Sequence, residues 1–177
     1  SLRGEEVTES FLPAADLPVD AHLPGGYVPD DRQRLDIYKR IAAARTHADV
    51  QAIEEEIQDR FGPPPTPVRN LLELIRLRVD AAGVGVESIA AKEDHLTVIL
   101  APRNRLDDKT VARLWRHPVA NRPGWRWVQV RPDRIVVELQ GGSALGAAAA
   151  VVRALAEPAP ARPSSKGRQG SATRRNP

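Results

Sequence analysis

The sequence predicts an α+β domain with a helical N-terminal half of three helices, followed by a small mixed sheet with two further helices. Apolar residues between residues 30 and 82 recur at spacings of three and four, which is typical of amphipathic helices. Between residues 95 and 139, apolar and polar residues alternate instead, as in strands with one buried face. Prolines and glycines separate these segments and mark their ends.

The helical half begins with an extended segment. Residues 17–23 alternate apolar with polar positions, and Pro18 interrupts them, so we predict an edge strand or an extended arm rather than a central strand. The first helix then starts at Asp30 or Asp31, either of which is a good N-cap. Its predicted apolar face consists of Ile37, Tyr38, Ile41, Ala42 and Ala44, with Leu35 at the edge.

The second helix opens at a sequence that resembles a capping box, with Thr46 as the N-cap and Asp49 in place of the usual glutamate. Gly62 is a suitable C-cap, and the three prolines after it prevent the helix from continuing. The third helix spans residues 66–82, and its apolar residues cover so much of its circumference that we predict a central helix. The apolar stripe of the second helix is Val50, Ile53, Ile57 and Phe61.

Two strand pairs and two helices are predicted for the second half of the chain. Alternating runs separated by short polar turns indicate hairpins, and capping residues indicate where the helices begin. The predicted elements are strands near residues 84–89, 95–100, 125–130 and 135–139, a short helix from Asp107 or Asp108, and a last helix from Ser143 to about Glu157.

Composition excludes some classes of site. The chain has no cysteine, so disulfides and thiolate metal ligands are excluded. No apolar run approaches the length of a membrane span. There is also no methionine, not even at position 1, so we expect a piece of a longer protein, and a cytoplasmic setting fits this composition.

Composition and patterning divide the 177 residues into a polar linker (1–15), a folded domain (16–157) and a basic tail (158–177). We expect the tail to be disordered. Five of the 26 basic residues lie in the tail, which has no acid, so residues 1–157 hold 21 basic and 23 acidic residues. The body is therefore mildly acidic, which argues against a nucleic-acid-binding core domain. The tail itself would suit weak nonspecific contact with DNA phosphates.

The second helix carries an acidic face directed away from its apolar stripe. Within this face, Glu56 and Asp59 are three residues apart and therefore share one side of neighbouring turns. From periodicity alone, the simplest interpretation is a solvated surface. The alternative is a docking surface for an arginine-rich partner, with Arg60 partly neutralising Glu56. The acidic face consists of Glu54, Glu55, Glu56, Gln58 and Asp59.

Three other features are better explained as structural. The glycine-rich turn at residues 141–146 follows a strand and precedes a helix, but it lacks the lysine of a phosphate-binding loop. The four histidines are widely separated and do not predict a metal site. Trp125 and Trp127 share one face of a strand, as base-stacking residues do, but tryptophans beneath a helix usually belong to the core. No nucleophile motif is present.

Four motifs in fixed order resemble one known family. They are D-L-P-V-D-A-H-L-P (residues 16–24), Y-V-P-D-D-R-Q-R-L-D-I-Y-K-R-I-A (27–42), E-I-Q-D-R-F-G-P-P-P (56–65) and L-L-E-L-I-R-L-R (71–78). Together they are similar to the C-terminal domain of bacterial transcription-repair coupling factor (Mfd). The resemblance is strong over residues 16–85, moderate in the following sheet and absent after Glu157.

The resemblance implies a role within a larger protein. The family's parent is an ATP-driven translocase on double-stranded DNA that dislodges stalled RNA polymerase and recruits the excision-repair factor UvrA. The C-terminal domain is implied to be a non-catalytic, autoinhibitory clamp, which packs on the parent's N-terminal UvrB-like module and masks its UvrA-binding surface. In the family, the glutamate and aspartate of E-x-x-D-R-F-G contact arginines of that module. These positions match Glu56 and Asp59, which favours the docking interpretation.

The resemblance also implies where the chemistry lies. We expect no catalytic residue, metal site or cofactor in this fragment, because ATP and magnesium belong to the parent's motor in the bacterial cytoplasm. Two rival hypotheses remain: an accessory domain that contacts DNA through the basic tail and the tryptophans, and an enzyme in its own right.

Overall fold

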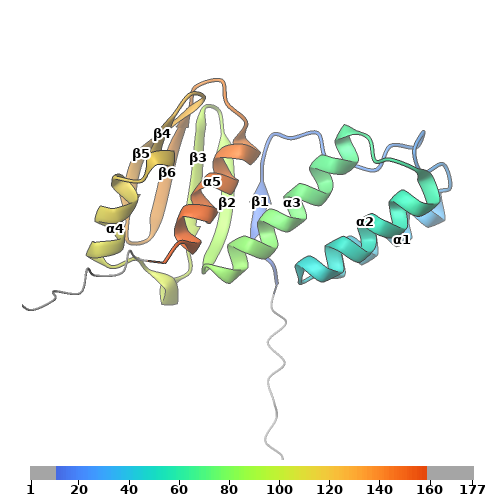
Figure 1. The fold of residues 1–177 in the computed structure, drawn as a ribbon, viewed down its shortest axis with the longest axis horizontal. Helices are drawn as coiled ribbons and strands as arrows, with labels where there is room; N and C mark the ends of the chain where they lie inside the picture. The colour runs from blue at the N-terminus through green and yellow to red at the C-terminus, as the bar shows by residue number, and fades with distance from the viewer. Residues whose placement is uncertain (1–10, 159–177) are drawn as a thin grey trace, which may run out of the picture.

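The computed structural model describes residues 11–158 of the chain (Figure 1). It confirms the predicted α+β fold, in which three helices come first and a six-stranded mixed sheet with further helices follows. Within residues 11–158, none of the helices has the length and apolar character that a membrane span needs. The helices are α1 (Asp31–Ala43), α2 (His47–Phe61), α3 (Thr66–Gly83), α4 (Asp108–Trp115) and α5 (Ala144–Ala156), with short 3-10 helices η1 (Pro102–Asn104) and η2 (Pro118–Ala120).

The helices begin where their capping residues lie. The Oδ1 atom of Asp30 accepts a hydrogen bond from the N–H of Gln33 (2.9 Å), which caps α1. At α2 the capping box is complete, because Thr46 Oγ1 accepts from the N–H of Asp49 (3.1 Å) and Asp49 Oδ2 accepts from the N–H of Thr46 (3.0 Å). Gly62, with φ of +84°, ends α2 in a conformation that favours glycine. The predicted limits of these helices are therefore confirmed.

The sheet has the strand order β1-β2-β3-β6-β5-β4, and only the β1–β2 pair is parallel. Both predicted hairpins form: residues 93–94 turn between β2 and β3, and residues 132–133 turn between β5 and β6. Figure 1 shows α3, α4 and α5 on one side of the sheet, with α1 and α2 beyond α3. The strands are β1 (Ala14–Asp16), β2 (Val86–Lys92), β3 (His95–Leu100), β4 (Asn121–Arg122), β5 (Trp125–Arg131) and β6 (Arg134–Leu139).

The N-terminal boundary differs from the prediction. The linker predicted for residues 1–15 extends too far, because Ala14–Asp16 form β1 and pair with Ser88–Ala90 of β2. Residues 17–23 form an extended arm rather than a strand. Pro18 explains the break, because a proline cannot donate a ladder hydrogen bond. Apart from Pro158, the tail lies outside the described residues.

The helix α3 joins two hydrophobic cores. Its N-terminal part packs Val68, Leu72 and Ile75 into the core of the helical half, while Leu77 and Ala81 belong to the core between the sheet and α5. Burial of each large apolar side chain contributes about 1.5–3 kcal/mol, so both cores hold α3 firmly. The prediction of a central helix is confirmed, and α3 fixes the position of α2 relative to the sheet.

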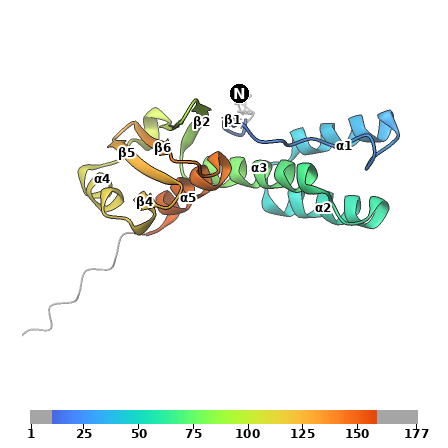
Figure 2. The same ribbon diagram turned by 90° about the horizontal axis from the view of Figure 1, so that it is seen from above.

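The extended arm is tied to the helical half by hydrogen bonds. Tyr38 of α1 accepts a hydrogen bond at its hydroxyl from the N–H of Leu23 (2.8 Å). Asn70 of α3 donates from Nδ2 to the carbonyl of Asp20 (2.9 Å). Figure 2 shows the arm running from β1 along the helical half to α1. These contacts explain why the arm keeps an extended conformation without belonging to the sheet.

Candidate functional site: the acidic face of the second helix

The helix α2 buries its apolar stripe and turns its acidic face outward. Val50, Ile53 and Ile57 are buried against the neighbouring helices. Successive residues of a helix are about 100° apart, so Glu55 and Asp59 point away from the core. On the same argument, Glu54 and Glu56 lie on the two flanks of the buried stripe.

Glu56 is held by two arginines of its own domain. Its Oε2 atom lies 2.5 Å from Nη1 of Arg40 in α1, and its Oε1 atom lies 3.0 Å from Nη1 of Arg60 one turn along α2. The bond to Arg40, then that to Arg60, lowers the pKa of the Glu56 carboxyl below its ordinary value. Both carboxylate oxygens are thus engaged, while the side chain remains 36% exposed to solvent.

The other flank of the acidic face is also paired. Glu54 forms an ion pair with Arg76 of α3, and Glu55 accepts a hydrogen bond from Nε2 of Gln51 (2.8 Å). The sequence indicated only Arg60 as a neutralising residue. Arg40 and Arg76 were missed because they come from other helices, and only packing brings them to α2. The face is therefore less negative than its sequence suggests.

Asp59 differs from its neighbours on the acidic face. Its side chain is exposed, and no salt bridge or side-chain hydrogen bond engages its carboxylate within the described chain. It lies three residues from Glu56, about 60° around the helix axis. The structure thus brings the two predicted site residues to one surface, with Glu56 fixed by arginines and Asp59 available.

The end of α2 is fixed by aromatic contacts. The Tyr27 ring lies 5.9 Å from the Phe61 ring, and the Tyr27 hydroxyl donates to the carbonyl of Gly62 (2.6 Å). The Arg60 guanidinium lies 5.1 Å from the centre of the Phe61 ring, a cation–π distance. These contacts orient Arg60 while it also reaches Glu56. The D-R-F-G sequence at residues 59–62 therefore shapes the surface that carries Glu56 and Asp59.

The glycine-rich turn at residues 141–146 is a close-packed connection. A side chain at Gly142 would place its Cβ atom 2.4 Å from the carbonyl oxygen of Gly124. Ser143 Oγ accepts the N–H of Gly146 (3.1 Å) and thereby caps α5. The glycine spacing therefore serves the close contact between two loops, Gly142 against Gly124.

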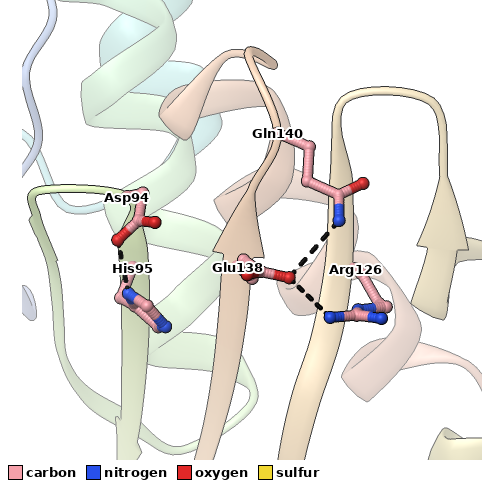
Figure 3. Close-up of polar contacts among 5 residues, drawn as sticks. All are labelled: Asp94, His95, Arg126, Glu138 and Gln140. Atoms are coloured by element: carbon pink, nitrogen blue, oxygen red, sulfur yellow. Dashed lines mark hydrogen bonds and ion pairs between the residues drawn. The ribbon is translucent and has the colours of Figure 1, made fainter.

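Each histidine lies beside one carboxylate. Figure 3 shows His95 turned toward Asp94 on the exposed sheet surface, where their side chains are 2.7 Å apart. In the same view Arg126 and Gln140 converge on Glu138, at 2.8 and 3.3 Å. Within residues 11–158, no group of three or more potential ligands could hold a metal ion. The other pairs are His22–Asp20, His47–Asp80 and His117–Glu157.

The strand tryptophans belong to the core. Trp127 is 3% exposed, and Trp125 is partly buried and donates from Nε1 to the carbonyl of Val119 (2.9 Å). A β-bulge between Trp127 and Gln129 shifts the register, so Val130 also faces inward. The hypothesis that these tryptophans stack on bases is therefore wrong. Their burial agrees with the core role that the sequence favoured.

The fold and the motifs can now be compared with known proteins. A family model described as the TRCF domain matches residues 17–111, more than half of the chain. The chain belongs to the TRCF domain family. It corresponds to the C-terminal domain of transcription-repair coupling factor, a DNA-repair protein. The matched range includes the arm, all three N-terminal helices and the acidic face.

Relatives of the TRCF domain are full-length transcription-repair-coupling factors. The protein of Mycobacterium bovis is 44% identical over 101 residues, which cover 57% of this chain and 8% of the relative. The protein of Escherichia coli is 36% identical over 92 residues, 52% of this chain and 8% of the relative. This chain thus spans less than a tenth of the length of these curated relatives.

A solved structure shows the same fold. The crystal structure of a C-terminal domain of transcription-repair coupling factor has a TM-score of 0.67 and 20% sequence identity, covering 81% of this chain and 91% of that one. The likeness extends beyond the residues that the family model matches. The sheet half of this TRCF domain therefore retains the fold where its sequence has diverged.

Proposed function

We propose that this TRCF domain is a non-catalytic autoinhibitory clamp of an ATP-dependent DNA translocase in transcription-coupled nucleotide excision repair. It would dock through the acidic face of α2 on the parent's N-terminal UvrB-like module. Docking would mask the UvrA-binding surface until the parent engages RNA polymerase in the bacterial cytoplasm. ATP and magnesium would act in the parent's motor, outside this chain.

The exposed and unpaired carboxylate of Asp59 beside Glu56 carries the proposal. A guanidinium from a partner can approach Asp59 without first breaking an ion pair, because none involves it in the described residues. Glu56 is held in place by Arg40 and Arg60, so little side-chain entropy would be lost if a further arginine approached this partly exposed carboxylate. Asp59 would offer an unpaired carboxylate to a partner arginine, and Glu56 would offer a carboxylate that is already held in position.

The energy of such a contact suits a releasable clamp. Hydrogen bonds to charged groups contribute about 1.5–3 kcal/mol each, and Glu56 would contribute less because its charge is shared. Two contacts then favour the closed state by a few kcal/mol. Shifting an equilibrium from 1:99 to 99:1 takes about 5.5 kcal/mol, which partner binding can supply. The clamp would therefore keep the resting protein closed and would open when the parent binds its partner.

Titration of this chain with the parent's N-terminal module tests the proposal. We expect Asp59→Arg to weaken binding by tenfold or more, since about 1.4 kcal/mol is lost for each factor of ten. Asp108→Arg is the matched control, because it makes the same charge change at the exposed start of α4, away from α2. Equal binding of wild type and Asp59→Arg at low salt would show that α2 does not dock.

A further inference from the structure

A groove of about 880 Å³ lies between α3 and α5. The two helices stand side by side over the sheet (Figure 1), and residues of both line the groove. Each residue of a helix rises about 1.5 Å, so the α5 wall, from Leu145 to Ala156, is about 16 Å long, or three helical turns. We call this surface the α3–α5 groove. Glu56 and Asp59, on which the proposed docking of α2 depends, are not among its lining residues.

The α5 wall of the groove is an apolar stripe. Its residues recur at spacings of four, three and four, so they share one side of the helix: Leu145, Ala149, Val152 and Ala156. Val152 is buried in the floor, whereas Leu145 and Ala149 are only partly buried. Arg153, at the edge of the stripe, is the only charged residue of α5. A helix at a protein surface ordinarily turns a polar face to solvent, and one that is apolar all round is usually covered. The composition of α5 therefore indicates that a further element covers this stripe.

The α3 wall of the groove carries two acids. Glu73 and Asp80 are seven residues apart, so they lie on one side of α3, two turns or about 10 Å from each other. Both residues are exposed, and the buried Leu77 between them continues the apolar floor. Arg76 lines the same wall but forms an ion pair with Glu54 of α2. The α3 wall therefore presents negative charge at two points beside an apolar floor.

The charges that border the groove are open to a partner. Within residues 11–158, neither Glu73 nor Arg153 takes part in a salt bridge or a side-chain hydrogen bond. Asp80 lies 2.5 Å from Nε2 of His47, a contact that is ionic only when the imidazole is protonated. A partner can therefore reach Glu73 without first breaking an ion pair. Because the α3 wall is acidic and the α5 wall has a single cation, the two walls also fix the orientation of a charged partner.

We propose that the α3–α5 groove binds an amphipathic helix of a protein partner. The apolar side chains of this helix pack on the α5 stripe and on Leu77, as a helix packs in the groove between two others. Two lysines or arginines on one flank of the helix, seven residues apart, reach Glu73 and Asp80, because the same spacing of about 10 Å separates both pairs. An acidic residue on the opposite flank pairs with Arg153. This contact does not depend on docking through α2.

The acids of the α3 wall distinguish this partner from others. A nucleic acid or an anionic membrane surface would bring phosphates against Glu73 and Asp80, and like charges would repel. A second copy of this chain would present α5 with a single cation, Arg153, against two acids. A helix with one apolar face and one basic flank satisfies the α5 stripe and both carboxylates together. Charge complementarity therefore favours such a helix as the occupant.

Fluorescence anisotropy of the whole chain with two labelled synthetic peptides tests the inference. Both peptides are alanine-rich, about 18 residues long and thus able to form a helix, and carry one leucine stripe. The first has lysines seven residues apart on one flank of the stripe, and the second has glutamates there. We expect the lysine peptide to bind at least about tenfold more tightly than the glutamate peptide. Glu73→Lys with Asp80→Lys should reverse this preference. Ala149→Arg, which places a long charged side chain in the groove, should weaken binding of the lysine peptide by about tenfold or more.

The matched control is Asp36→Lys with Asp108→Lys, which makes the same change of charge at exposed positions of α1 and α4, outside the groove. This pair should keep the preference of wild type for the lysine peptide. Asp59→Arg should keep it as well, because Asp59 lies on α2 and not in the groove. The Asp59 variant thus separates this inference from the proposed docking of α2.

Four results would overturn the inference. They are a lysine peptide that does not saturate the chain below about 1 mM, equal binding of the two peptides, a reversed preference in the control pair, and loss of binding in Asp59→Arg, which would place the peptide on the acidic face of α2. Sedimentation that shows self-association of the chain, prevented by Ala149→Arg, would assign the groove to a second copy and would overturn it too. The charge exchange on α3 keeps the test decisive should Ala149→Arg fail to fold.

Discussion

Replacement of Glu56 by glutamine separates the structural role of this residue from its role in docking. Glu56→Gln keeps the size of the side chain but removes the charge that Arg40 and Arg60 share. Partly exposed ion pairs contribute about 0.2–1 kcal/mol each, and glutamine retains some hydrogen bonding. We therefore expect a loss of about 1 kcal/mol in the free energy of unfolding, or about 2–4 °C in Tm for a domain of this size.

The pH dependence of this loss identifies its cause. Folding lowers the pKa of Glu56, chiefly through Arg40, so its stabilisation is complete above the ordinary glutamate value of about 4.3. It disappears as pH falls through the lowered folded-state pKa, because the carboxylate is then protonated in both states. The stability gap between wild type and Glu56→Gln should therefore shrink on acidification. Urea unfolding of both proteins at a series of pH values measures this stability gap.

Glu55→Gln is the matched control for Glu56→Gln. Glu55 is exposed on the same helix and accepts only from Gln51, so its neutralisation should change stability by less than about 0.5 kcal/mol at every pH. A gap for Glu56→Gln that stays constant down to about pH 3 would refute the reasoning, since charge would then not be its source. Equal stability of the two variants at pH 7 would also refute it.

Two further substitutions test contacts that shape the fold. Gly142→Ala should destabilise the protein by at least about 1 kcal/mol, because the new methyl would lie 2.4 Å from the carbonyl oxygen of Gly124. Gly26→Ala is the control, because Gly26 has open space around it and the substitution should not destabilise the protein. Thermal melts of the two variants compare them. Tyr27→Phe should lower the free energy of unfolding by about 1 kcal/mol, since it removes the 2.6 Å hydrogen bond to the Gly62 carbonyl. Urea titrations measure this change, and an unchanged midpoint would show that the bond contributes nothing.

Local signals predicted most of the fold. Helix limits followed from Asp30, Thr46 and Gly62, because capping and left-handed geometry depend on a few neighbouring residues. The two hairpins followed from alternation over short turns. By contrast, β1 and β4 were missed, because strands of three and two residues carry too little periodicity and exist only through pairing with distant segments.

The candidate site was predicted only in part. Helical spacing predicted that Glu56 and Asp59 share one side of α2, and the structure has them so, whereas their role in docking stays a prediction. The sequence did not reveal that Arg40 pairs with Glu56 and Arg76 with Glu54, because those ion pairs depend on how α1 and α3 pack against α2. Average charge likewise concealed the basic character of residues 95–131, because the acidic residues of the helical half offset them in the total.

Affinity of the full-length parent for UvrA tests the central claim most directly. If docking through Asp59 masks the UvrA-binding surface, Asp59→Arg in the whole protein should release it and tighten the apparent dissociation constant for UvrA by about tenfold or more. Asp108→Arg should leave that constant unchanged. UvrA affinity that is identical in wild type and Asp59→Arg, measured without RNA polymerase, would contradict the account.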